Sequence, residues 1–160
     1  MHSIQYNNVY NFQGHDTTTS GLSFSLYCIS QHRHVQEKVF REQQDIFGDD
    51  INRHPTYNDL SNMKYIEQVI KESLRLYPSV PLIGRLTTED TCNIISIGIF
   101  ISIHGLSVTT MAMQRSPEVF EDPLTFRPER FEANSEQKNP YSFLAFSAGP
   151  RNCIGIHFID

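Results

Sequence analysis

Five prolines in the last third of the chain limit what this sequence can fold into. They stand at positions 117, 123, 128, 140 and 150. Proline lacks a backbone N–H and clashes with the preceding helical turn, so neither a long helix nor a central strand can run through such a stretch. Beyond residue 117 we therefore expect a meandering chain with short turns, until a last helix begins near Cys153.

Apolar residues at helical spacing predict three helices before that point. The first is expected to begin near residue 14 or 16, to end near residue 30, and to be largely buried because its apolar stripe is broad. The second covers about residues 35–47 and carries a mainly polar pattern, which indicates a surface helix. The third covers residues 63–77, is strongly amphipathic and ends before Pro78.

One short β hairpin is predicted between these helices and the prolines. Isoleucine occupies every odd position from Ile95 to Ile103, which is the two-residue period of a strand. We expect the chain to turn near His104 and Gly105 and to return over residues 107–113. The fold class is therefore mainly α with a small β hairpin or sheet (α+β).

Composition excludes several classes of protein. The net charge of −5 provides no broad basic surface, so nucleic acid is not expected as a partner. Cys28, Cys92 and Cys153 are far apart and odd in number, which argues against a disulfide framework or a zinc site and favours a reducing compartment. Residues 1–11 do not resemble a signal peptide, and the most apolar stretch, 94–103, is much shorter than the roughly 20 residues of a membrane helix.

Cys153 has the local setting of a metal-binding thiolate. Gly149 and Pro150 favour a sharp turn just before it, which would place Cys153 at the start of a helix. Unpaired backbone N–H groups and the helix dipole favour an anion there. The alternative is a buried helix cysteine that happens to follow a Gly-Pro turn.

The segment Phe146-x-x-Gly149-x-Arg151-x-Cys153-x-Gly155 resembles the haem-binding signature of the cytochrome P-450 monooxygenases. The resemblance implies the C-terminal part of the cytochrome P-450 fold, with haem as cofactor and Cys153 as the thiolate ligand of its iron. Gly155 would leave space for the macrocycle, Arg151 would meet a haem propionate, and Phe146 would shield the sulfur from water.

Two further motifs are similar to the family's structural core. Glu72-x-x-Arg75 places both side chains on one helix face, and such a pair taken alone is usually a solvated surface ion pair. Phe126-Arg-Pro-Glu-Arg-Phe131 resembles the family's meander motif. The resemblance implies that Arg130 joins Glu72 and Arg75 in a buried triad on the proximal side.

Gly14-His-Asp-Thr-Thr18 resembles the oxygen-activating stretch of the family's distal helix. By that resemblance Asp16 and Thr17 are catalytic: Thr17 hydrogen-bonds the bound oxygen and Asp16 relays protons. The alternative is a helix N-cap, in which one of these side chains satisfies the first N–H groups.

Arg85 ends the segment Pro78-Ser-Val-Pro-Leu-Ile-Gly-Arg85, and in the similar family segment the arginine binds a haem propionate from a strand lining the pocket. The alternative is an ordinary arginine at the end of a strand.

The motifs together look most like family 4, whose members commonly hydroxylate fatty acids and related lipids. Many of them carry a glutamate before the Gly-His-Asp segment that can esterify the haem. This chain has Gln13 there, and an amide cannot form that ester, so we expect non-covalent haem.

The resemblance covers residues 12–158 and leaves residues 1–11 divergent, so residues 1–160 are expected to be a partial domain, a C-terminal fragment of a several-fold longer family member. The chain has no dinucleotide fingerprint, so the electrons are expected from an NADPH-dependent flavoprotein reductase. The full-length family implies the cytosolic face of the endoplasmic reticulum membrane, although this chain has no anchor of its own.

The function implied is that of a haem-thiolate monooxygenase, which inserts one atom of O2 into a small organic or lipid substrate. Two alternatives stay open. In the first alternative, the chain is an inactive truncated haem-binding remnant. In the second, it is a haem-dependent isomerase or peroxygenase that needs no reductase.

Overall fold

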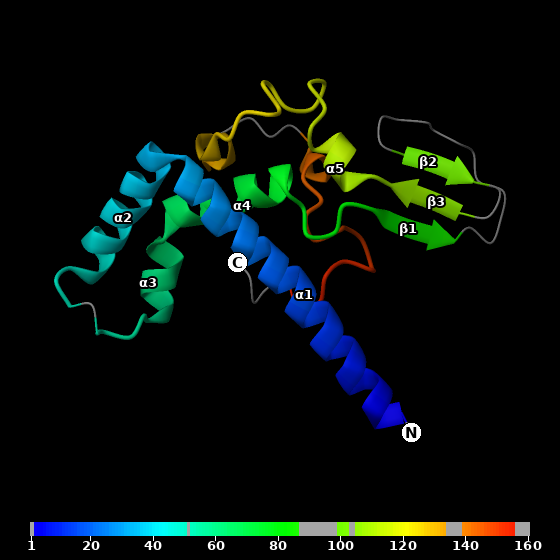
Figure 1. The fold of residues 1–160 in the computed structure, drawn as a ribbon, viewed down its shortest axis with the longest axis horizontal. Helices are drawn as coiled ribbons and strands as arrows, with labels where there is room; N and C mark the ends of the chain where they lie inside the picture. The colour runs from blue at the N-terminus through cyan, green and yellow to red at the C-terminus, as the bar shows by residue number, and fades with distance from the viewer. Residues whose placement is uncertain (1, 51, 87–98, 103–104, 134–138, 156–160) are drawn as a thin grey trace.

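The structure, a computed structural model, describes residues 2–50, 52–86, 99–102, 105–133 and 139–155 (Figure 1). The predicted fold class is confirmed, because helices dominate and the strands form one small sheet. The helices are α1 (His2–Gln31), α2 (Arg33–Phe47), α3 (Tyr57–Asn62), α4 (Lys64–Leu76) and α5 (Thr110–Met113), with 3-10 turns η1 (Pro128–Phe131) and η2 (Pro140–Ser142); the strands are β1 (Ile83–Leu86), β2 (Ile99–Ser102) and β3 (Gly105–Val108).

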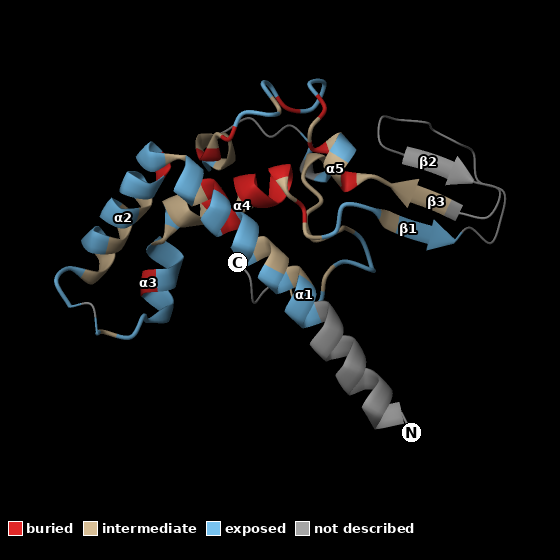
Figure 2. Ribbon diagram, in the orientation of Figure 1, coloured by how far each residue is buried: buried red, intermediate tan, exposed pale blue. Residues whose placement is uncertain are grey.

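Helix α4 is the element around which the others pack. The predicted bounds of α2 and α4 are correct to within two residues. Helices α1 and α2 and the turn η1 all contact α4, and the most buried part of the ribbon is its C-terminal half (Figure 2). A core cluster joins these elements and consists of Cys28, Val35, Val69, Leu76 and Phe126.

Side chains cap the N-terminal ends of α3 and α4. The Glu42 carboxylate of α2 accepts hydrogen bonds from the backbone N–H groups of Tyr65 and Ile66, the latter at 2.9 Å, at the start of α4. Thr56 and Asp59 form a capping box at the start of α3. Such contacts satisfy N–H groups that a helix cannot pair internally.

Helix α1 differs from the prediction at its start and in its burial. It begins at His2 rather than near residue 14, because a glycine inside a helix costs only about 1 kcal/mol and does not stop it. Asp16 and Thr17 therefore lie in the helix interior, and the N-cap alternative is wrong. The expected burial is also wrong, since Leu22 is 60% and Leu26 is 67% exposed. The described side chains of α1 pack on the rest along one narrow face that includes Ser25 and Cys28.

The sheet has the antiparallel strand order β1-β3-β2. In β3, Val108 pairs with Ile83 of β1 and with Ile99 of β2. The predicted pairing of a hairpin is confirmed for the described strands, whereas residues 95–98 and 103–104 lie outside them. The predicted return over 107–113 is wrong beyond Val108, because the buried Thr110 hydroxyl donates to the Val80 carbonyl at 2.7 Å and the chain enters α5 there.

The chain after residue 117 meanders as its prolines predict. Its described part contains the turns η1 and η2 and otherwise irregular backbone. The helix predicted from Cys153 is not seen at Cys153, Ile154 or Gly155, which form a loop and a turn, and residues 156–160 lie outside the described part.

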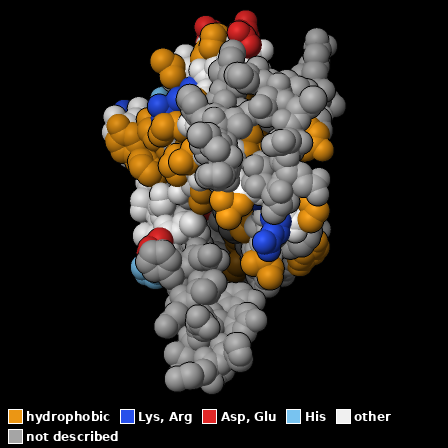
Figure 3. All heavy atoms as spheres, turned by 90° about the vertical axis from the view of Figure 1, so that its right-hand side faces the viewer, with side chains coloured by type: hydrophobic (Ala, Val, Ile, Leu, Met, Phe, Trp, Pro, Cys, Tyr) orange, Lys and Arg blue, Asp and Glu red, His pale blue; other side chains and the backbone are white. Residues whose placement is uncertain are grey.

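The end of the molecule that carries the sheet exposes hydrophobic side chains in several groups, with isolated basic side chains between them (Figure 3). Leu86 at the end of β1 is 86% exposed. This end therefore offers apolar surface beside the cavity described next.

Candidate functional site

A cavity of about 480 Å³ lies between α1, the C-terminal half of α4, the segment entering β1 and the C-terminal loop. Its volume is within the range of small-molecule and cofactor sites. Most of the surface that lines it is apolar, although polar side chains also contribute. The lining residues of α1 and α4 are Thr17, Thr18, Gly21, Leu22, Ser25, Ile70 and Leu74; those of the later segments are Ser79, Val80, Ile83, Arg85, Ala145, Phe146, Ser147, Arg151, Asn152 and Cys153.

Residues from three distant motifs line this one cavity. They are Thr17 from α1, Arg85 from β1, and Phe146, Arg151 and Cys153 from the C-terminal loop. The structure thus brings Thr17 and Cys153, which are 136 positions apart in the sequence, to the same cavity. Thr17 is half-buried, whereas Arg85 and Arg151 are exposed at the cavity.

Asp16, Gly149 and Gly155 do not belong to the cavity lining. The Asp16 carboxylate is exposed and lies 3.0 Å from Nδ1 of His15. Gly149 has φ +80°, which glycine adopts at little cost and other residues rarely adopt. A Cβ added at Gly155 would lie 3.7 Å from the Cys153 sulfur.

Backbone hydrogen bonds close the loop that carries Cys153. The Cys153 N–H donates to the Phe146 carbonyl at 2.9 Å, and the Asn152 N–H donates to the Gly149 carbonyl at 3.2 Å. Ser147 and Gly149 both have positive φ within this closed loop. The loop therefore holds the cysteine at the cavity through hydrogen bonds of its own backbone.

The two described cysteines, both free thiols, have different surroundings. Cys28 is 2% exposed in the core cluster, and burial raises the pKa of its thiol. A buried neutral thiol of this kind behaves as a small hydrophobic side chain. Cys153 is only half-buried and lines the cavity. Among the described cysteines, Cys153 is therefore the one placed to bind a ligand.

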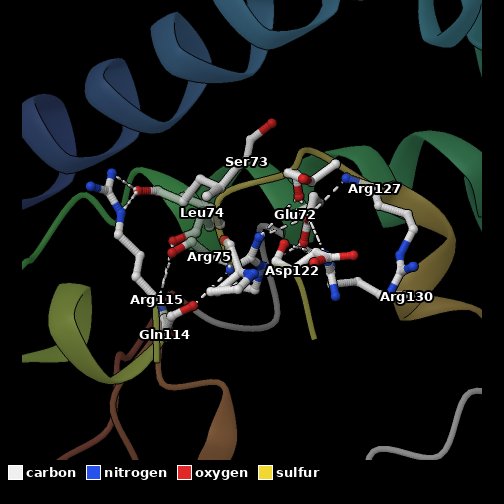
Figure 4. A network of polar contacts seen from close by, with 12 residues as sticks. Glu72, Ser73, Leu74, Arg75, Gln114, Arg115, Asp122, Arg127 and Arg130 are labelled. Atoms are coloured by element: carbon white, nitrogen blue, oxygen red, sulfur yellow. Dashed lines mark hydrogen bonds and ion pairs between the residues drawn. The ribbon is translucent and has the colours of Figure 1, made fainter. Parts of the chain in front are cut away.

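Glu72, Arg75 and Arg130 form a compact ionic cluster beside the cavity (Figure 4). The Arg75 Nε and Nη2 atoms donate to the two Glu72 carboxylate oxygens at 2.7 and 2.9 Å, and Arg130 Nε donates to Glu72 Oε1 at 2.9 Å. Both Glu72 and Arg75 are fully buried. The cluster is therefore a buried charge network and not a solvated surface pair.

The same arginines tie α4 to the meander. Arg75 Nη1 donates to the carbonyls of Gln114 and Pro123 at 2.7 and 2.8 Å. Arg130 Nη1 donates to the Glu121 carbonyl at 3.0 Å. The guanidinium groups of both arginines lie over the Phe120 ring, at 4.9 and 6.0 Å from its centre.

Sequence reasoning missed Gln114 and Phe120, both buried within this network. Gln114 stands in a short segment between Met113 and Arg115, where no periodicity or motif singles it out. Its partners are 30 to 40 positions away, so only the fold reveals its role.

A cytochrome P450 family model matches residues 8–158, nearly the whole chain. The chain belongs to the cytochrome P450 family. It is 46% identical over 155 residues to cytochrome P450 4d2 of Drosophila melanogaster. The matched region covers 92% of this chain and 29% of that protein. It is 45% identical to cytochrome P450 4e2 of the same species and 44% identical to cytochrome P450 4V2 of Rattus norvegicus, each over 148 residues, covering 92% of this chain and 27% and 28% of those proteins.

These P450 relatives are all family 4 members, as the motifs indicated, and the chain spans less than a third of their length. Within the described part of this P450 chain, no helix is both long enough and apolar enough to cross a membrane. The side chain of Gln13 and the whole of Cys92 lie outside the described part.

Proposed function

We propose that this chain forms the haem-binding core of a cytochrome P450 monooxygenase. The observation that supports the proposal is the single cavity lined by Thr17, Arg85, Phe146, Arg151 and Cys153. The donor set fits the group: a half-buried thiol suits the iron, apolar walls suit the macrocycle, and two guanidiniums suit carboxylates. When bound, the haem would supply the redox chemistry that transfers one atom of O2 to the substrate and releases the other as water.

Cys153 would bind the iron as a thiolate, from a loop already closed by its own backbone hydrogen bonds. Phe146, which also lines the cavity, would limit the access of water to the sulfur. Arg85 and Arg151 would each pair with a propionate, since a guanidinium forms strong charge-assisted bonds with a carboxylate. Gly149 and Gly155 would contribute the loop turn and the space beside the sulfur.

In α1, the Thr17 hydroxyl, which also lines the cavity, would hydrogen-bond the oxygen held there. The Asp16 carboxylate, which is exposed one residue before Thr17, would serve as the proton relay toward the site. We propose a small organic or lipid substrate, O2, and an NADPH-dependent flavoprotein reductase as the electron source. For the whole protein we propose the cytosolic face of the endoplasmic reticulum membrane.

Titration of the haem-free chain with haem tests the role of Cys153. We expect wild type to bind haem in a saturable way with the absorption spectrum of a thiolate ligand, and Cys153→Ser to lose that spectrum. Cys28→Ser is the matched control, since it also removes a described thiol, one that does not line the cavity. Thiolate-type binding by Cys153→Ser equal to that of wild type would disprove this assignment.

A further inference from the structure

The Gln114 side chain bridges two segments that meet beside the cavity. It is fully buried at the C-terminal end of α5. Its Nε2 atom donates to the carbonyls of Leu74 and Arg75 at 3.3 and 3.1 Å, and its Oε1 atom accepts from the Leu144 N–H at 2.9 Å. An amide has both donors and an acceptor, so it can satisfy carbonyls on one side and an N–H on the other.

Leu144 lies at the root of the loop that ends at Cys153. Its carbonyl accepts from the Ser147 N–H at 3.1 Å, and the Phe146 carbonyl between them accepts from the Cys153 N–H at 2.9 Å. Residues 145–147 also line the cavity. A displacement of Leu144 would therefore be carried to the position of the Cys153 backbone.

The other side of the bridge is fixed. Leu74 and Arg75 are buried residues near the end of α4, and Arg75 is held by both carboxylate oxygens of Glu72. Arg75 Nη1 also donates to the backbone carbonyl of Gln114 at 2.7 Å (Figure 4). Gln114 is thus anchored to α4 through its side chain and its backbone, which leaves its Oε1 atom in a fixed place for Leu144.

We propose that Gln114 is a positioning residue for Cys153, linking the buried Glu72–Arg75 pair to the loop that carries the cysteine. The proposal rests on the proposed function for the identity of the ligand. Without the Gln114 side chain, the buried Leu74 and Arg75 carbonyls lose its amide donor and the Leu144 N–H loses its acceptor, so the loop root loses its fixed position.

Amide hydrogen exchange of the haem-free chain tests this bridge directly. In Gln114→Met, a substitution of similar size, we expect exchange at Leu144 to be about tenfold faster, because loss of one hydrogen bond has about that effect. Exchange at Cys153 should also rise, both measured relative to the core amide of Val69. Gln114→Asn, whose side chain is one methylene too short to span both partners, should act in the same direction and carries the test if Gln114→Met does not fold.

Thr110→Val is the matched control. It removes a buried hydrogen bond from the other end of α5, to the Val80 carbonyl, and leaves the bridge to Leu144 intact. We expect it to lower thermal stability without selectively speeding exchange at Leu144 or Cys153. Equal relative exchange at Leu144 in the control and in both Gln114 variants would overturn the proposal.

A second measurement uses the haem-loaded chain. At equal haem content, the Gln114 variants should show a smaller thiolate-ligated fraction in the absorption spectrum than the Thr110→Val control. An unchanged fraction would also overturn the proposal. If no haem binds to wild type, the proposed function fails for this chain, while the exchange experiment still decides whether Gln114 positions the loop.

Discussion

At the scale of single residues, Glu72 is a fully buried carboxylate that several donors surround. Its carboxylate accepts from two nitrogens of Arg75, from Nε of Arg130 and from the Arg127 N–H at 2.9 Å. Such a buried carboxylate is tolerated only because these donors replace the lost water. Removal of Glu72 would leave buried guanidinium charge without its counterion.

We therefore predict that Glu72→Ala lowers the free energy of unfolding by roughly 3–5 kcal/mol and reduces haem retention. Urea unfolding of the haem-free chain, followed by circular dichroism, measures the first effect. Glu67→Ala is the control on the same helix, because Glu67 pairs with Lys71 near the surface and should cost less than about 1 kcal/mol. Equal losses in the two variants would contradict a structural role for the buried cluster.

Residues were predictable from the sequence to different degrees, for physical reasons. The family resemblance pointed to Glu72 and Arg75, whose spacing alone favours a surface ion pair, whereas the Gly149-Pro150 turn already marked Cys153 as a candidate metal ligand. Gln114 was not predictable, because what makes it useful is the pair of carbonyls at the end of α4 and one N–H in a distant loop. Long-range polar contacts of this kind leave no local pattern.

At the scale of elements, long amphipathic segments were predicted well and irregular boundaries poorly. Helix α4 has a clear apolar face, and Pro78 follows soon after its end, so both limits could be derived. Helix α1 is longer than predicted, because Gly14 suggests a helix start but lies in the interior of the helix. The return strand was predicted too long, because the buried hydrogen bond from Thr110 to Val80 is invisible in the sequence.

Helix α3 provides a prediction at this scale that depends on pH. The Arg53 guanidinium, at 2.7 Å, together with the hydrogen bonds from Thr56, holds the pKa of the Asp59 carboxyl well below its usual range. A carboxyl with a lowered folded pKa adds stability above its unfolded pKa, about 3.9, and this contribution is lost as the pH falls toward the folded value.

Asp59→Asn should therefore lower the thermal midpoint at pH 7, and the difference from wild type should shrink as the pH is brought below about 3.9. Thermal unfolding at a series of pH values measures this. Asp45→Asn, at an exposed position of α2, is the control and should change the midpoint little at any pH. A difference at Asp59 that stays constant down to low pH would argue against the ionic cap.

At the scale of the whole molecule, the cavity is assembled from segments near residues 17–25, 70–85 and 145–153. Their order along the chain was available from the motifs, but their meeting was not, since it depends on how α1 crosses α4 and on the meander that returns the chain (Figure 1). The exposure of Leu22 and Leu26 was unexpected for the same reason. The apolar pattern of a helix does not show which of its faces other segments cover.

The central claim is that this chain holds haem through the thiolate of Cys153. The most direct test is the absorption spectrum of the purified, haem-loaded chain after reduction and addition of carbon monoxide. The account predicts the strongly red-shifted Soret band of thiolate-ligated haem in wild type and in Cys28→Ser. A band typical of haem without a thiolate ligand, or no haem uptake at all, would contradict it.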